Sequence, residues 1–326
     1  MMPAMPTPPV SRKPGTCFTC CLATGLLMFL STAHATGFEP LPISGVLLEH
    51  GSSAYTLCNA TGKFDPEGRH MAPRKPTAEH SNACAIFPEN EIAAPLPGFK
   101  LFKHANRQVM MNNSLTGQTD KKIASVMDVV WRNPAAGECI YGTRVLALSS
   151  ADADYNAQLP GKQFFRITDI ARGGFAGQDI EVAYAMYATG AEPVYRIGRS
   201  FTAVQYYKRP GYERQPLTEP AFREAINGVE TTERAVPSFS QQTASLNDDW
   251  VNFTTLVGLP KRPASPMLYV KAPCNNETPA EQPQAIRLRQ AIAPFVELSV
   301  PGFVPSQFAP SGLLSKPATN STTPQP

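Results

Sequence analysis

Apolar and polar residues alternate through much of the chain after about residue 120, which is the pattern of half-buried β-strands. Residues 123–132 alternate in this way and are rich in β-branched side chains, although three of their apolar residues also fit a helical spacing. We interpret this segment as a strand, because residues 133–137 then form a hairpin loop before a second strand at 139–148.

Further strands are predicted at intervals typical of hairpins. They cover residues 164–170, 179–187, 193–206, 249–257, 267–271, 285–290 and 295–300. Within 179–187, the even-numbered residues from Ile180 to Met186 are apolar and share one face. A short helix is predicted over 218–228, where Asn227-Gly228 ends it. Many short strands with little helix predict an all-β fold, namely an antiparallel, jelly-roll-like β-sandwich with one connecting helix.

The same pattern divides the chain into four parts. Residues 36–105 lack regular alternation and are expected to form an irregular segment packed on the main domain. The β-sandwich is expected to span residues 106–304. Residues 305–326 are rich in proline, serine and threonine, so we expect a disordered tail. Residues 1–35 have a different character and predict a signal peptide.

The first 35 residues carry the parts of an export signal. Arg12 and Lys13 precede a mostly apolar stretch at 17–30, and Ala33-His34-Ala35 matches a small-x-small cleavage site. The alternative is an uncleaved membrane anchor, but the apolar stretch falls short of the roughly 20 residues that span a bilayer. We therefore expect a secreted or periplasmic protein with no membrane anchor after signal removal.

Four of the seven cysteines lie outside the predicted signal. An even number in an oxidising compartment indicates two disulfides, and three pairings are possible. Cys58 with Cys84 and Cys139 with Cys274 is the favoured arrangement. The alternative is a metal site built from Cys58, His70, His80 and Cys84, but these spacings match no short zinc pattern. We expect neither a metal nor a cofactor.

Charge and motifs exclude several classes of function. The formal net charge is +3, and it falls further when Arg12 and Lys13 are removed, so nucleic acid is not an expected partner. The sequence contains no nucleophile elbow, zinc-protease helix, P-loop or dinucleotide fingerprint. Paired carboxylates remain possible for a hydrolase acting on glycans. The candidates are Asp152, Asp154, Asp169, Asp179, Glu181, Asp248 and Asp249.

The most distinctive local run is residues 169–175, Asp-Ile-Ala-Arg-Gly-Gly-Phe. Asp169 and Arg172 could form an ion pair, and the two glycines permit an unusual turn that presents Arg172 and Phe175 to a ligand. A plain tight turn between two strands is the favoured interpretation. Residues 152–156 have the opening spacing of a calcium loop, but Ala157 and Gln163 replace its glycine and glutamate, which favours a polar turn.

Four runs resemble an uncharacterised group of exported bacterial β-rich proteins. They are 131–134 (Trp-Arg-Asn-Pro), 137–142 (Gly-Glu-Cys-Ile-Tyr-Gly), 169–175 and 250–255 (Trp-Val-Asn-Phe-Thr-Thr). The resemblance covers roughly residues 120–304 and implies no activity, so it assigns no site residues. We expect an exported, non-enzymatic β-sandwich that binds a surface ligand, glycan or protein, with a secreted glycan hydrolase as the alternative.

The export signal makes a direct prediction about the mature protein. Cleavage after Ala35 is expected, because the small residues at Ala33 and Ala35 fit a signal-peptidase site. N-terminal sequencing of the exported protein should therefore begin at Thr36. An intact N-terminus in the membrane fraction would contradict the prediction.

Overall fold

The computed structural model describes residues 37–48, 51–58, 84–187, 191–194, 196–201, 246–259, 261–290 and 296–306. The predicted signal peptide, the predicted helix at 218–228, His70, His80 and nearly all of the tail lie outside these residues. No helix within the described ranges is long and apolar enough to cross a membrane. The only helical elements there are two short 3-10 turns, η1 (Ser114–Thr116) and η2 (Ala151–Ala153).

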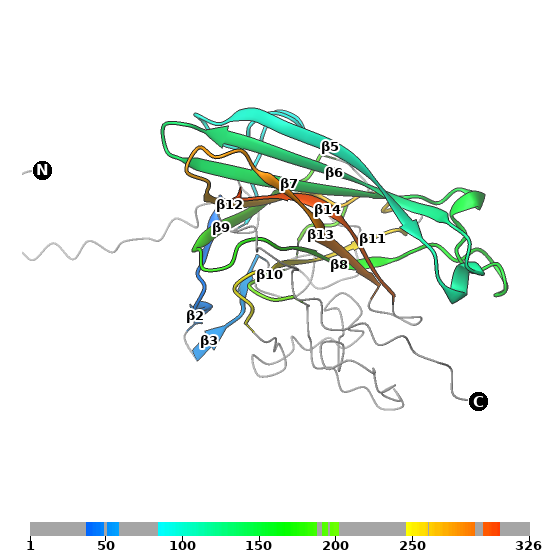
Figure 1. The fold of residues 1–326 in the computed structure, drawn as a ribbon. Helices are drawn as coiled ribbons and strands as arrows, with labels where there is room; N and C mark the ends of the chain where they lie inside the picture. Colours follow the sequence, from blue (N-terminus) through cyan, green and yellow to red (C-terminus); the bar gives the residue numbers. More distant parts are fainter. Residues whose placement is uncertain are drawn as a thin grey trace, which may run out of the picture. The chain divides into compact units, whose positions relative to one another are not determined.

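Two antiparallel six-stranded sheets make up the fold (Figure 1). The first sheet has the order β1 (Glu39–Leu41), β9 (Ile180–Ala185), β12 (Met267–Pro273), β7 (Glu138–Ala147), β6 (Lys121–Asn133), β5 (Lys100–Met111). The second has the order β14 (Val296–Val304), β13 (Ala280–Gln290), β8 (Ile167–Arg172), β11 (Val251–Val257), β10 (Arg196–Gly198), β4 (Tyr55–Leu57). A separate hairpin joins β2 (Val46–Leu48) to β3 (Gly51–Ser53). The expected all-β sandwich is confirmed.

The main core lies between the two sheets. The predicted alternation supplies it, because Ile180, Val182 and Tyr184 of β9 are buried there with Val126 and Val130 of β6. The second sheet contributes its own inward-facing residues. They include Ile170, Val251, Phe253, Ile286 and Leu288. Burial of such side chains contributes roughly 1.5–3 kcal/mol each, so this layer dominates the stability of the fold.

The first sheet is also covered on part of its outer face. Trp131 lies there against Tyr269, with ring centroids 5.7 Å apart, and its indole N–H donates to the carbonyl of Ile92 at 3.0 Å. A Cβ at Gly142 would come within 2.5 Å of the Trp131 ring, so glycine is required for this packing. Residues 84–99 therefore pack over the first sheet and make its strands near β9 buried on both faces.

Both predicted disulfides are present. The sulfur atoms of Cys58 and Cys84 are bonded at 2.04 Å, so neither cysteine is a free thiolate for the alternative metal site. Cys139 and Cys274 are joined at 2.14 Å and connect the ends of the neighbouring strands β7 and β12. Cross-links of this kind are typical of non-reducing compartments, and each typically stabilises a small domain by about 2–4 kcal/mol.

The N-terminal part is more regular than expected. The prediction of an irregular segment at 36–105 is wrong at four points, because β1 joins the first sheet, β2 and β3 form a hairpin, β4 joins the second sheet, and β5 begins at Lys100. β1 and β4 have three residues each, too few to show an alternation in sequence. The sandwich therefore includes segments before residue 106 as edge strands.

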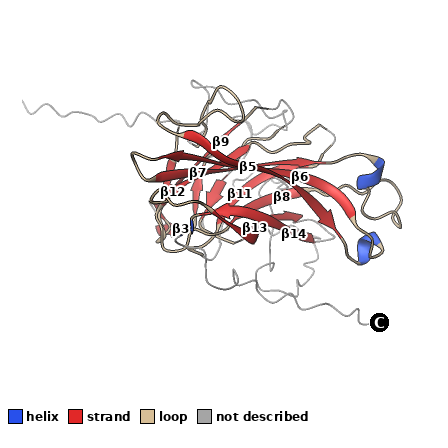
Figure 2. Cartoon of the chain, turned by 45° about the horizontal axis from the view of Figure 1, so that its top comes forward, coloured by secondary structure: helices blue, strands red, loops and turns tan. Residues whose placement is uncertain are grey.

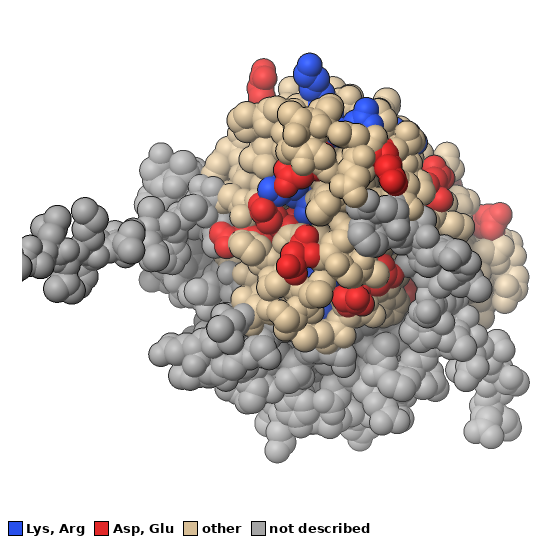
Figure 3. Space-filling view, turned by 60° about the vertical axis from the view of Figure 1, so that its left-hand side comes forward, with Lys and Arg blue, Asp and Glu red and all other residues tan. Residues whose placement is uncertain are grey.

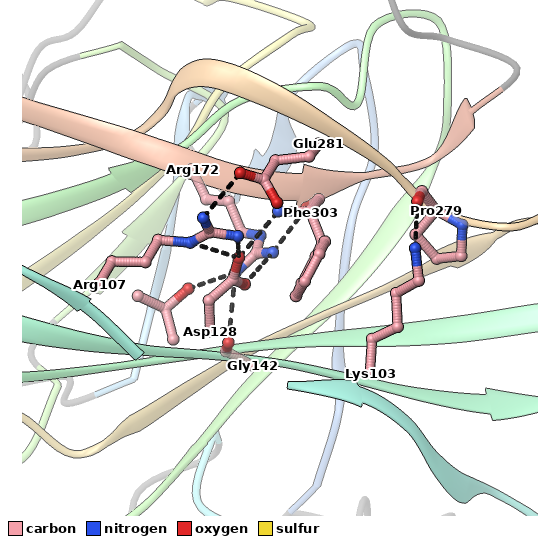
Figure 4. A network of polar contacts seen from close by, with 9 residues as sticks. Lys103, Arg107, Asp128, Gly142, Arg172, Pro279, Glu281 and Phe303 are labelled. Carbon is pink, nitrogen blue, oxygen red and sulfur yellow. Dashed lines mark hydrogen bonds and ion pairs between the residues drawn. The ribbon is translucent and has the colours of Figure 1, made fainter. Parts of the chain in front are cut away.

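A buried carboxylate connects the two sheets on the β5 side (Figure 4). Asp128 of β6 is fully buried and accepts hydrogen bonds from Arg172 of β8 at 2.7 Å and from Arg107 of β5 at 3.0 Å. Its second oxygen also accepts the backbone N–H of Phe303 in β14 at 2.9 Å. Arg172 in turn donates to the Phe303 carbonyl at 2.6 Å. The Asp128–Arg172 ion pair thus binds both backbone polar groups of Phe303.

Substitution of this carboxylate tests its structural role. Asp128→Asn leaves the buried Arg172 guanidinium without its counter-charge and leaves Arg107 with Glu281 alone, and an unpaired buried charge typically costs about 3–5 kcal/mol. Denaturant unfolding should show a loss of this size. The matched control is Asp120→Asn, at an exposed aspartate whose loss should cost little. Equal stability of the two variants would contradict the assignment.

Candidate functional site

The three residues singled out in the 169–175 run do not form one site. Asp169, Arg172 and Phe175 are all buried, so the expectation that Arg172 and Phe175 face a ligand is wrong. β8 lies between β11 and β13 in the second sheet, and both of its faces are covered. Arg172 points inward to Asp128, and Phe175 packs edge-on against Tyr141 in the core, with centroids 5.6 Å apart.

Asp169 lies on the other face of β8 from Arg172. Residues three apart on a strand point to opposite faces, so the proposed Asp169–Arg172 pair does not form. Asp169 instead pairs with Arg287 at 2.9 Å and Arg289 at 2.6 Å, both on the neighbouring strand β13. Glu297 of β14 also contacts Arg287, at 3.3 Å. Burial raises the pKa of Glu297, against the attraction of the two arginines.

The turn after β8 is held by two aspartates. The N–H of Gly174 donates to Asp249 at 2.9 Å, and the N–H of Gly177 donates to Asp248 at 3.2 Å. Gly174 has φ of +100°, a conformation that favours glycine. Burial raises the pKa of Asp249, although hydrogen bonds from the turn favour its charged form. The segment is therefore a tight turn between β8 and β9.

Most of the remaining carboxylate candidates also have structural partners. Asp179 accepts the N–H of Ile43 at 3.0 Å, and Glu181 pairs with Lys271 at 2.9 Å. Asp154, in the segment that resembles a calcium loop, accepts the N–H of Gln163 at 3.0 Å and that of Asn156. No group of three His, Cys, Asp or Glu suited to a metal ion occurs among the described residues. Asp154, Asp179 and Glu181 thus hold neighbouring segments of the fold in place.

One side of the described molecule is acidic in character. Figure 3 shows Asp and Glu side chains spread over this side, with fewer Lys and Arg among them. Asp179 and Asp248 are among the exposed carboxylates of the described residues. An acidic surface repels the phosphate backbone of nucleic acids, so this side favours neutral or cationic ligands.

The outer face of the first sheet is accessible along β5, β6 and β7, which Figure 2 shows side by side. We call this surface the open face. Its members are exposed or half-buried: His104, Asn106, Gln108, Ser125, Met127, Arg144, Leu146 and Tyr187. The strand register aligns them in rows. One row is Asn106, Met127 and Arg144, and the next is Gln108, Ser125 and Leu146.

Two polar pairs lie at the covered side of the open face. The hydroxyls of Tyr187 and Tyr269 are 3.1 Å apart, and Arg144 forms an ion pair with Glu91 from the covering segment. Burial raises the pKa of Tyr187, so its phenol stays protonated at neutral pH. The open face therefore offers amides and hydroxyls, the His104 imidazole, one balanced ion pair and two apolar side chains.

Sequence reasoning did not identify the open face, because its residues come from three separate strands and from Tyr187 after the end of β9. Half of β5 fell in the segment predicted to be irregular, and its amides carry no motif. The sequence signal that could have found it is the alternation along β5 that places the polar residues His104, Asn106 and Gln108 on one face of the strand. No protein-family model, curated protein or solved structure matches the chain, so the geometry alone identifies this surface as the candidate site.

Glu192 is a buried carboxyl group whose pKa is strongly raised. Its side chain is buried and forms an ion pair with Arg262. Burial raises its pKa from 4.5 to about 7, although the Arg262 charge opposes the change. Because a raised carboxyl pKa favours the protonated form in the folded state, this group destabilises the fold progressively as pH rises from about 4.5 to 7.

Replacing Glu192 by glutamine removes that titration. The free energy of unfolding of Glu192→Gln should exceed that of the native protein by up to about 3 kcal/mol above pH 7, and should match it near pH 4. Denaturant unfolding across this range measures the difference, with Glu89→Gln as an exposed control. A difference that does not change with pH would refute the prediction.

Proposed function

We propose that the protein is an exported, non-enzymatic β-sandwich that binds a ligand or partner on the open face. The observation that carries the proposal is the mixed character of that face. Leu146, whose exposed fraction is 44%, and half-buried Met127 lie among amides, hydroxyls and an ion pair on rigid strands. Binding surfaces typically combine apolar contact area with polar groups in fixed positions.

Two features support export. Residues 1–35 have the tripartite pattern of a signal peptide, and the four cysteines outside that segment all form disulfides. Disulfides are rare in reducing cytosol and persist in secreted and periplasmic proteins. The proposed binding would therefore occur outside the cytoplasm.

A secreted glycan hydrolase is the second candidate. Its support is the proximity of Asp169 and Glu297, which contact the same Arg287 guanidinium, together with the raised pKa of Glu297. A carboxyl with a raised pKa beside an ionised one is the arrangement that glycosidases use. Both carboxylates are paired with Arg287, however, and Asp169 is buried away from any substrate. The exposed groups of the open face therefore favour ligand binding over hydrolysis.

Adsorption to cell envelopes tests the proposed function. The exported protein should sediment with isolated envelopes of the organism that makes it, and Leu146→Glu should bind at least about tenfold more weakly. Leu159→Glu is the matched control, because Leu159 has an exposed fraction of 47% and lies outside the open face. The same samples should release no reducing sugar.

Two results would overturn the proposal. Equal loss of adsorption in both leucine variants would show that the open face is not the binding site. Sugar release that Glu297→Gln abolishes would identify the protein as the hydrolase instead.

A further inference from the structure

We infer that the ligand of the open face is a neutral glycan chain that lies across β5, β6 and β7. This inference rests on the proposed function, because it specifies the ligand class of the same surface. It is carried by the hydrogen-bonding groups of the face, by its charge balance and by the position of its apolar side chains.

The polar groups suit a ligand that is rich in hydroxyls. The amides of Asn106 and Gln108 each donate and accept hydrogen bonds, and both side chains are exposed. The hydroxyls of Ser125 and Tyr187 also do both. Sugar hydroxyls have the same dual capacity, so each can find a partner here, whereas a phosphate or carboxylate ligand would use only the donors.

The charge on the open face is balanced. Arg144 is paired with Glu91, and the side-chain exposures of 18% and 31% place both groups at the edge of solvent. The face therefore lacks the excess of arginine or lysine that a polyanionic ligand requires. This balance favours a neutral glycan over an acidic one.

The two apolar side chains lie within the rows, beside polar side chains. Met127 is flanked by Asn106 and Arg144 across the strands, and Leu146 follows Ser125 in the next row. The C–H face of a sugar ring can pack on such side chains while its hydroxyls reach the neighbouring groups. Adjacent strands lie about 4.8 Å apart, so a chain that crosses them meets one side chain per strand in each row, and every row contains polar and apolar members.

A protein partner fits this surface less well. The cores of protein interfaces are enriched in aromatic side chains and typically bury about 800 Å² on each partner. The described open face presents Leu146 and Met127 among polar groups, with the ring of Tyr187 at one end. Amides and hydroxyls beside one balanced ion pair are better matched by a neutral saccharide.

Affinity electrophoresis provides the test. The exported protein is run through gels that contain hydroxyethyl cellulose, xylan, galactomannan or dextran, with polygalacturonate as the anionic comparison. At least one neutral polysaccharide should retard the native protein. Asn106→Ala/Gln108→Ala should reduce that affinity about tenfold or more, because several hydrogen bonds are lost, and Tyr187→Phe should reduce it less.

The control variant is Gln158→Ala, which removes an exposed glutamine away from the open face and should leave binding unchanged. Retardation by a neutral polysaccharide that only the open-face variants weaken supports the inference. Retardation by polygalacturonate alone, or by none of the polymers, overturns it. Envelope adsorption that Leu146→Glu still weakens would then keep the proposed function and reject only the glycan. Neutral-glycan binding that the open-face variants do not affect also overturns the inference.

Discussion

The contact between the two sheets on the β5 side depends on one buried carboxylate, that of Asp128. The Asp128 carboxylate collects donors from β5, β8 and β14, and thereby connects the first sheet to the second. The carboxylate is fully buried, so its removal would leave Arg172 inside the sandwich without a counter-charge. Hydrogen bonds are directional, so this network favours the sheet packing in which the Phe303 N–H meets Asp128 and the Phe303 carbonyl meets Arg172.

This interaction also explains the misleading character of the 169–175 run. Arginine and aspartate near two glycines suggest an exposed functional turn, yet both charged residues belong to a strand whose two faces are covered. Arg172 finds its partner 44 residues away in sequence, on the opposite sheet. Such a partner depends on the packing of the two sheets, and local sequence carries no information about it.

Other parts of the fold were readable from local pattern. The strand at 179–187 could be predicted because its even-numbered residues are apolar, and the presence of two disulfides followed from compartment and count, which left three pairings possible. The open face could not be predicted in the same way. Asn106, Met127 and Arg144 become neighbours only through the register of three strands, and a shift of one residue would turn each to the other face.

The long edge strand β5 directs two cations towards the interior of the sandwich. Lys103 donates to the carbonyl of Pro279 at 3.1 Å, and Arg107 reaches Asp128 and Glu281. A foreign strand that approached this edge would have to cover these charges and displace their contacts with the second sheet. Inward-pointing charges of this kind protect natural edge strands against sheet-to-sheet aggregation. Lys103 and Arg107, which bind the second sheet, thus also oppose the addition of a strand from another copy at β5.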